Sequence, residues 1–188
     1  RKAFDLTQEK EADASRFGRH EFGQSLLLAA RLIEAGVHFV TVRLRPAEFD
    51  FDTHQDNFSR LRALLPPFDK GLAALIDRLK DRGLFNETAL MVAGEFGRTP
   101  KVNAQGGRDH WARAMFALMA GGDVQGGQVI GATDDRASEP VGKSYSPEDL
   151  AASFFQNIGI DPQHEFQTNV GRPINLIRDG QPINQLFS

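Results

Sequence analysis

The sequence predicts an α/β protein with a mostly parallel sheet flanked by helices. Stretches with apolar residues at helical spacing alternate along the chain with short apolar runs that are typical of buried strands. The 188 residues, of which 40% are hydrophobic and 25% charged, are enough for one core of ordinary composition. We therefore expect residues 1–188 to form a single α/β domain. Because the sequence opens at Arg1 without a methionine, we also expect it to be part of a longer protein.

The first half of the chain supplies the alternation of helices and strands. Residues 17–35 carry apolar residues at helical spacing, and Gly36 is a natural helix stop. Val37–Val42 is β-branched and aromatic, which predicts a buried strand. A second helical stretch covers residues 57–82, and Thr88–Ala93 has the composition of the next strand. The order helix–strand–helix–strand predicts parallel neighbours in one sheet.

Proline and glycine divide the rest of the chain. Pro66–Pro67 should break the second helical stretch, because proline is poorly tolerated inside a helix. Met115–Ala120 predicts a third strand. Ser146–Ile158 predicts a helix, since a capping serine is followed by a proline and two acids in the first turn. In the tail, Arg172–Asn175 and Gln181–Asn184 lie on either side of Asp179–Gly180, which predicts a short hairpin.

Composition excludes several classes of function. The net charge of -3 and the scattered arginines give no footprint for nucleic acid, so no such partner is expected. The chain has no cysteine, which excludes disulfides and thiolate metal sites. It also has no run of about 18 apolar residues, so we expect no membrane span. Any metal must be held by nitrogen and oxygen donors.

Chemically capable residues gather in segments near the ends of the predicted strands. Phe51–His54 follows the first strand after a few residues, Gly94–Pro100 follows the second at once, and Gly107–Trp111 precedes the third. Carboxylates and histidines just beyond strand ends suggest a metal site at the carboxyl edge of a parallel sheet. We therefore expect a divalent cation, Zn, Mn, Ca or Mg, as cofactor.

Asp52 and His54 are the first candidate ligands. In an extended stretch, side chains two residues apart point to the same side, so a carboxylate oxygen and an imidazole nitrogen could meet one cation. The neighbouring Asp50 and Asp56 add negative charge that would favour a cation. The alternative is a loop with an Asx turn and a surface histidine.

Glu95 and His110 are the other candidate ligands. Glu95 directly follows a glycine at a strand end, and its carboxylate needs either a metal or Arg98 as partner. His110 could give one nitrogen to a metal while Asp109 accepts a hydrogen bond from the other nitrogen, or ligates instead. The alternative for His110 is a ring packed against Trp111.

Arg98 and Arg108 are the candidate catalytic residues. The guanidinium fork matches the oxygens of phosphate, sulfate or carboxylate, so two such groups beside a cation would form an anion site. The alternative is that both are structural and clamp Glu95 and Asp109.

Together these motifs resemble a known family. Their order along the chain is similar to that of the bacterial domain of unknown function 1501 family, in which the first motif usually begins with tryptophan where this chain has Phe51. The resemblance covers nearly the whole chain. The segments that carry it are Gly18–His20, the three segments above, Gly121–Asp134 and Gly171–Pro173. It implies an alkaline-phosphatase-like metal core of the alkaline phosphatase, sulfatase and phosphoglycerate mutase superfamily, of which this chain would be the C-terminal part.

The resemblance also implies roles for single residues. Asp52 and His54 resemble the aspartate and histidine that reach one metal from a single loop, and His110 resembles the later histidine that completes that site. Glu95 stands where relatives carry an aspartate followed by a histidine for a second metal, but Phe96 replaces that histidine. The segment with the nucleophile is not in this sequence. Export to the periplasm or the outside is implied as well.

The expected function is therefore a metal-dependent hydrolase of phosphate or sulfate esters. Its substrate would be a small anionic ester or a sulfated or phosphorylated glycan, with a cation at Asp52, His54 and His110 polarising an ester oxygen. One alternative is a non-catalytic protein that binds an anion or glycan on a degenerate scaffold of the same kind. Another is that the motifs are only structural.

Overall fold

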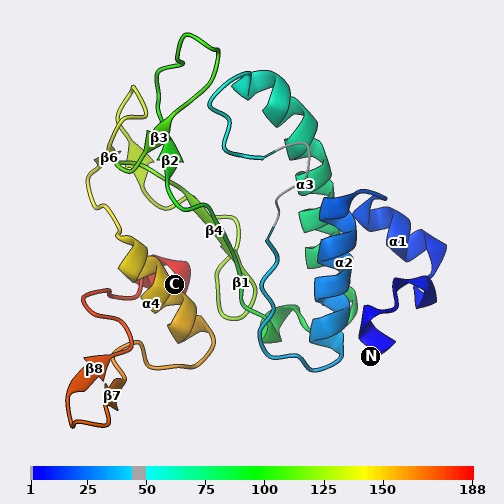
Figure 1. Ribbon diagram of the computed structural model, residues 1–188. Coiled ribbons are helices and arrows are strands. Elements are labelled where there is room, and N and C mark those ends of the chain that lie inside the picture. The colour runs from blue at the N-terminus through cyan, green and yellow to red at the C-terminus, as the bar shows by residue number, and fades with distance from the viewer. Residues whose placement is uncertain (1, 44–49) are drawn as a thin grey trace. The chain divides into compact units, whose positions relative to one another are not determined.

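The computed structural model describes residues 2–43 and 50–188 (Figure 1). The chain divides into two compact units. The first, here called the helical unit, consists of Arg1–Leu84 and Lys101–Asp109. The second, here called the strand unit, consists of Phe85–Pro100 and His110–Ser188. In the described part of the chain, no helix combines the length and the apolar content that crossing a membrane requires.

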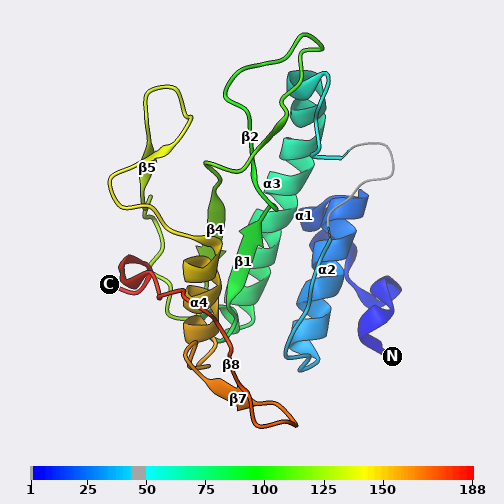
Figure 2. The ribbon, with the colours of Figure 1, turned by 60° about the vertical axis from the view of Figure 1, so that its left-hand side comes forward.

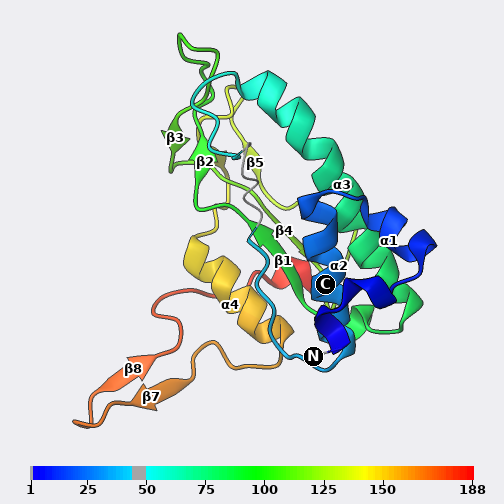
Figure 3. The ribbon, with the colours of Figure 1, turned by 45° about the vertical axis from the view of Figure 1, so that its right-hand side comes forward.

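Helices α1, α2 and α3 lie against one another in the helical unit (Figures 1 and 3). They span Glu11–Phe17, Glu21–Glu34 and Asn57–Asp81, and the 3₁₀ turns η1 (Lys2–Phe4) and η2 (Leu6–Gln8) precede them. Their core contains fully buried Phe17, Leu27 and Leu79. Both long helices expected from apolar spacing are confirmed. Helix α2 starts later than expected because His20 caps it, with Nδ1 accepting from the Gly23 amide at 3.1 Å.

The expected break at Pro66–Pro67 is wrong, because α3 continues through both prolines. Each proline lacks the N–H that would bond the carbonyl four residues earlier, which leaves the carbonyls of Arg62 and Ala63 without that donor. Both of these residues are exposed. Water can therefore solvate their carbonyls, and the helix need not end.

The strand expected at Val37–Val42 is also wrong. These residues form no ladder, and Val37 is 40% and Phe39 68% exposed. A run of β-branched and aromatic residues suits a half-buried pleated surface, and it forms a strand only where a neighbouring strand is available. In the helical unit the described neighbours are helices and loops, so this run stays irregular.

The strand unit consists of short antiparallel pairs and one helix. Strand β1 pairs with β4, β2 with β3, β5 with β6, and β7 with β8. The β1–β4 pair is the longest, and the β7–β8 hairpin projects beyond α4 (Figures 2 and 3). The elements are η3 Phe85–Glu87, β1 Leu90–Ala93, β2 Gly97–Arg98, β3 His110–Trp111, β4 Ala117–Ala120, β5 Ala132–Thr133, β6 Pro140–Val141, α4 Pro147–Asn157, β7 Glu165–Gln167, β8 Pro173–Asn175 and η4 Asn184–Leu186.

The mostly parallel, alkaline-phosphatase-like sheet is therefore wrong for the residues that the structure describes. Two of the expected strands exist, β1 and β4, but Leu90 pairs with Ala120 and Ala93 with Ala117, which is antiparallel. Parallel neighbours need a crossover, usually a helix. The chain between β1 and β4 instead forms β2, the loop 101–109 and β3, so β4 returns in the opposite direction.

The C-terminal part was predicted more closely. Helix α4 is confirmed, and Ser146 and Asp149 form a reciprocal capping box at its start. The predicted hairpin at Asp179–Gly180 is wrong. Strand β8 pairs instead with the earlier β7, through the turn Thr168–Arg172, where the Thr168 amide donates to the Arg172 carbonyl at 2.9 Å.

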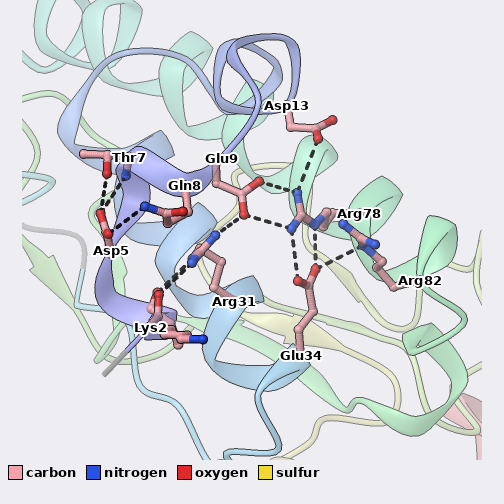
Figure 4. A network of polar contacts seen from close by, with 11 residues as sticks. Lys2, Asp5, Thr7, Gln8, Glu9, Asp13, Arg31, Glu34, Arg78 and Arg82 are labelled. Carbon is pink, nitrogen blue, oxygen red and sulfur yellow. Dashed lines mark hydrogen bonds and ion pairs between the residues drawn. The ribbon is translucent and has the colours of Figure 1, made fainter.

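A buried ionic network ties the start of the chain to α2 and α3 (Figure 4). The Arg78 side chain is 5% exposed and donates from Nε to Glu34 at 2.5 Å and from Nη1 to Glu9 at 2.9 Å. Arg31 forms an ion pair with the same Glu9 carboxylate, whose side chain is 8% exposed. Since a buried charge without a partner is costly, these residues are stable only as a set.

Acid is expected to weaken the helical unit through Glu9. Hydrogen bonds from Arg78, with a smaller effect of Arg31, hold the pKa of the Glu9 carboxyl below its ordinary value of 4.5. A lowered folded-state pKa contributes stability that is fully present above the ordinary pKa and is lost as the pH falls through the folded value. Urea unfolding followed by far-ultraviolet circular dichroism should show a midpoint that falls at pH below about 4.5. The fall should be smaller in Glu9→Gln, and equal falls in both proteins would contradict the prediction.

Candidate metal centre

The candidate centre begins with two loops of the helical unit, residues 51–57 and 103–109, here called the site loops. Phe51 anchors the first of them, since its ring makes edge contacts with Phe22 of α2 and Phe68 of α3. Thr53 is 1% exposed, and its hydroxyl donates to Asn57 Oδ1 at 2.6 Å. An aromatic ring and an inward threonine therefore fix the backbone around Asp52 and His54.

Asp52 and His54 extend from either side of the buried Thr53. Their side chains are 43% and 45% exposed, and Asp52 Oδ1 lies 3.0 Å from His54 Nε2. Asp52 and His54 therefore meet as expected, but through tight turns and not through an extended stretch, since the Thr53 amide donates to the Phe51 carbonyl at 2.9 Å and the His54 amide to the Asp52 carbonyl at 3.1 Å. The alternative expected from the sequence, a loop with an Asx turn and a surface histidine, also describes this segment, since the Asp52 amide donates to Asp50 Oδ1 at 3.3 Å and the His54 side chain is 45% exposed.

The other ring nitrogen of His54 faces the second site loop. His54 Nδ1 lies 2.7 Å from Asp109 Oδ1. Asp109 was expected to serve His110, and the structure shows that it serves His54. With both carboxylates ionised, the imidazole has two solutions: it carries two protons and donates to both, or it donates from Nδ1 to Asp109 while Nε2 and Asp52 share a cation.

The 3.0 Å between His54 Nε2 and Asp52 Oδ1 is an ordinary hydrogen-bond distance, which agrees with the first solution, and it is also compatible with the second. An ion about 2.0–2.2 Å from each donor, as zinc ligands require, would see them at an angle of about 90° when they are 3.0 Å apart. The carboxylate on Nδ1 then fixes the tautomer in which Nε2 carries no proton, which is the usual support for a metal-bound histidine. Asp52 and His54 therefore suit a cation held by oxygen and nitrogen.

Backbone hydrogen bonds join the two site loops directly. The Asn57 amide donates to the Gly106 carbonyl at 3.0 Å, and the Arg108 amide donates to the Thr53 carbonyl at 3.0 Å. The Asp56 amide donates to Gln105 at 3.2 Å. Since these bonds flank His54 on one loop and Asp109 on the other, they set the separation of the two side chains.

Gly107 permits this close approach, and Gly107→Ala is expected to disrupt it. A Cβ at this position would lie 1.9 Å from the His54 carbonyl oxygen, a backbone atom that cannot rotate away. We expect a loss of about 1–3 kcal/mol in the free energy of unfolding, the usual cost of overpacking. Urea unfolding measures it, with Gly126→Ala as control because no atom lies within 4 Å of a Cβ there. Equal stability of the two variants would contradict the prediction.

Glu95 and Arg98 are paired within the strand unit. Arg98 Nη2 lies 3.2 Å from Glu95 Oε1, and the side chains are 20% and 62% exposed. The ion-pair alternative considered for Glu95 is thus the arrangement that the structure shows. Arg98 also lies 5.6 Å from the centre of the Phe96 ring. A role for Glu95 as a metal ligand stays a prediction.

His110 opens β3, where it is paired in register with Arg98 of β2. Its ring packs on Phe96, with the centroids 4.3 Å apart. The expected alternative was packing on Trp111, but the Trp111 indole instead donates to the Ser138 carbonyl at 2.7 Å. Since Asp109 directly precedes His110, a trans peptide holds their Cα atoms about 3.8 Å apart.

The predicted residues thus fall into three groups. Asp52 and His54 lie together in the helical unit, and ligation by His110 of the strand unit stays a prediction. Glu95 and Arg98 form the ion pair described above. Arg108 lies over the Phe58 ring at 5.8 Å, which is a cation–π distance.

Sequence reasoning missed Asn103. Its amide nitrogen donates to the His54 carbonyl at 2.9 Å and to Asp109 Oδ1 at 3.2 Å. A signal was present, because asparagine followed three and four residues later by Gly106 and Gly107 is typical of a tight turn closed by the asparagine side chain.

Comparison with protein families gave a match over almost the whole chain. The family described as "protein of unknown function (DUF1501)" matches residues 1–187. No curated protein and no solved structure matched. The family description names neither an activity nor a ligand, so the chemistry of the site loops is the basis for a functional proposal.

Proposed function

The chain belongs to the DUF1501 family, and we propose that it holds one divalent cation at Asp52, His54 and His110 and uses it to hydrolyse phosphate or sulfate esters. The observation that carries the proposal is the arrangement of His54. One carboxylate lies at Nδ1, where it fixes the tautomer, and another lies at Nε2, where it could share an ion. Chain adjacency of His110 to Asp109 supports it as the third ligand.

The donor set favours some cations over others. Two imidazoles and one carboxylate suit Zn²⁺ or Mn²⁺ better than Ca²⁺ or Mg²⁺, which prefer oxygen ligands alone. Three protein ligands leave a coordination position open, as in catalytic rather than structural sites. Exposure of Asp52 and His54 agrees with access for a substrate.

Each residue has a defined part in the proposed reaction. A bound divalent cation would polarise an ester oxygen and lower the pKa of a water molecule beside it. Asp52 and His54 hold and orient that position, and Asp109 keeps the His54 ring in place through Nδ1. Arg98 and Arg108 would steady the anionic charge that develops on the ester oxygens. A small phosphate or sulfate monoester, free or on a glycan, is the substrate class that this site would take.

Metal content and turnover of the purified full-length protein test the proposal together. Elemental analysis after dialysis against Zn²⁺ or Mn²⁺ should give one ion per chain. Hydrolysis of p-nitrophenyl phosphate or p-nitrophenyl sulfate should depend on that ion. Binding of the ion without turnover of either ester would favour the alternative of a non-catalytic anion-binding protein. Absence of stoichiometric binding would overturn the proposal.

Glu95→Gln tests the remaining ligand candidate. If Glu95 only pairs with Arg98, the variant keeps the affinity of the wild type for the ion, because surface ion pairs contribute about 0–1 kcal/mol. If Glu95 ligates, the affinity falls. We also propose that the protein is exported, as the family resemblance implies.

A further inference from the structure

We propose that Asn103 is the positioning residue of the candidate centre, which sets the ring of His54 by holding the Asp109 carboxylate. This inference deepens the function proposed above and rests on it. Asn103 is not a candidate ligand, since its Oδ1 accepts from two backbone amides and its Nδ2 is a donor. It would act on the ion through Asp109, which contacts His54 Nδ1, and through its own bond to the His54 carbonyl.

The hydrogen bonds of Asn103 use both ends of its amide. Oδ1 accepts from the amides of Gln105 at 3.0 Å and Gly107 at 2.9 Å. Because two N–H groups point at this atom, it must be the carbonyl oxygen, which fixes the orientation of the amide. Nδ2 then has two protons to donate, and both have acceptors in the site loops.

The two protons of Nδ2 reach both sides of the candidate centre. One acceptor is the His54 carbonyl at 2.9 Å, and the other is the Asp109 carboxylate, with its oxygens at 3.2 and 3.3 Å. The Asp109 oxygen that takes the Asn103 proton is also the one that faces His54 Nδ1 at 2.7 Å. A single side chain therefore fixes the His54 backbone and the partner of the His54 ring.

Asparagine suits this position better than residues of similar shape. Aspartate would keep an oxygen for the amides of Gln105 and Gly107 but would have no proton for Asp109. Alanine would remove both functions. Two carboxylates facing each other without a donor repel, so Asp109 would turn from its present place. The expected consequence is loss of the fixed His54 tautomer.

Asn103→Asp in the full chain is the test, with Zn²⁺ as probe. Calorimetric titration should show affinity weakened by about 10–100-fold, the usual effect of losing an outer partner of a ligand. A role through charge alone predicts the opposite, since an added carboxylate attracts a cation. Asn157→Asp is the matched control, because Asn157 also bridges a turn, accepting from the Asp123 amide at 2.9 Å and donating to the Gly121 carbonyl at 3.2 Å. It should bind Zn²⁺ as the wild type does.

A second measurement reads the position of His54 without any metal. Nitrogen-15 NMR of the imidazole should show Nδ1 protonated and protected from exchange in the wild type, and unprotected in Asn103→Asp. If the wild type binds no Zn²⁺, the proposed function fails, and this signal alone decides the role of Asn103. If the wild type binds and Asn103→Asp binds equally well with Nδ1 still protected, the function survives and the positioning role is overturned.

A double-mutant cycle separates positioning from a general effect on folding. If Asn103 acts through Asp109, Asn103→Ala should weaken Zn²⁺ binding more in the wild type than in Asp109→Asn, where only the bond to the His54 carbonyl remains to be lost. Additive losses would show that Asn103 acts by another route and would overturn the proposal. Circular dichroism identifies variants that have lost α1–α3, and the conservative Asn103→Ser replaces any such variant in the cycle.

Discussion

His54→Ala is expected to abolish binding of a divalent cation and, with it, ester hydrolysis. The ring supplies Nε2 beside Asp52 Oδ1 at 3.0 Å, and no other side chain of the loop replaces an imidazole. Since the loss of an outer partner alone costs about 10–100-fold in metal affinity, loss of the ligand itself should exceed about 100-fold. Calorimetric titration with Zn²⁺ and elemental analysis measure the effect.

His38→Ala is the matched control for this prediction. His38 is exposed, belongs to the same unit and lies outside the site loops, so its loss should leave the affinity for Zn²⁺ unchanged. The fold of His54→Ala should also persist, because the partners of the ring, Asp52 and Asp109, are 43% and 51% exposed and can be solvated. Wild-type stoichiometry and affinity in His54→Ala would remove the basis of the metal centre.

Arg78→Ala should produce the largest loss of stability in the helical unit. The guanidinium, 5% exposed, donates to both oxygens of Glu34 and to Glu9. Its removal leaves the Glu9 carboxylate, 8% exposed, close to Glu34 with no shared cation. Breaking a buried pair in this way costs about 3–5 kcal/mol. Urea unfolding followed by far-ultraviolet circular dichroism measures the change.

Two further variants, Arg82→Ala and Arg78→Lys, serve as comparisons for the loss of stability in Arg78→Ala. Arg82 is 53% exposed and meets Glu34 at 3.5 Å, so Arg82→Ala should cost less than about 1 kcal/mol. Arg78→Lys keeps the charge but loses the planar fork, and an intermediate loss is expected. If Arg78→Ala were no less stable than Arg82→Ala, the Arg78 contacts would add nothing to the free energy of unfolding. The ion pair with Arg31 would then be enough to stabilise the Glu9 carboxylate.

Features that depend on contacts between residues close in the chain, such as α4, could be predicted from the sequence. Helix α4 begins where serine, proline and acids follow one another, because the cap and the first turn are made by those residues themselves. The meeting of Asp52 and His54 is also a local event, since tight turns of the chain at Phe51–His54 bring the two side chains together. Both depend on contacts over a few residues.

Non-local pairing was not predictable in the same way. The run Val37–Val42 has strand composition but forms no strand in the described part of the chain, and β1 and β4 pair in the direction that the intervening chain imposes. Composition carries no information about which neighbour is present. Asn103 was missed for the same reason, because its partners His54 and Asp109 come together only when the site loops meet.

The hydrogen bonds between the site loops have a further consequence. They join amides and carbonyls far apart in the chain, and a Cβ on Gly107 would lie 1.9 Å from the His54 carbonyl oxygen. Moving one site loop away from the other would break these hydrogen bonds together. The two loops should therefore open as one cooperative unit in native-state hydrogen exchange. The amides of Asn57 and Arg108 would then share a single protection free energy, and a cation bound by Asp52 and His54 would raise it for both.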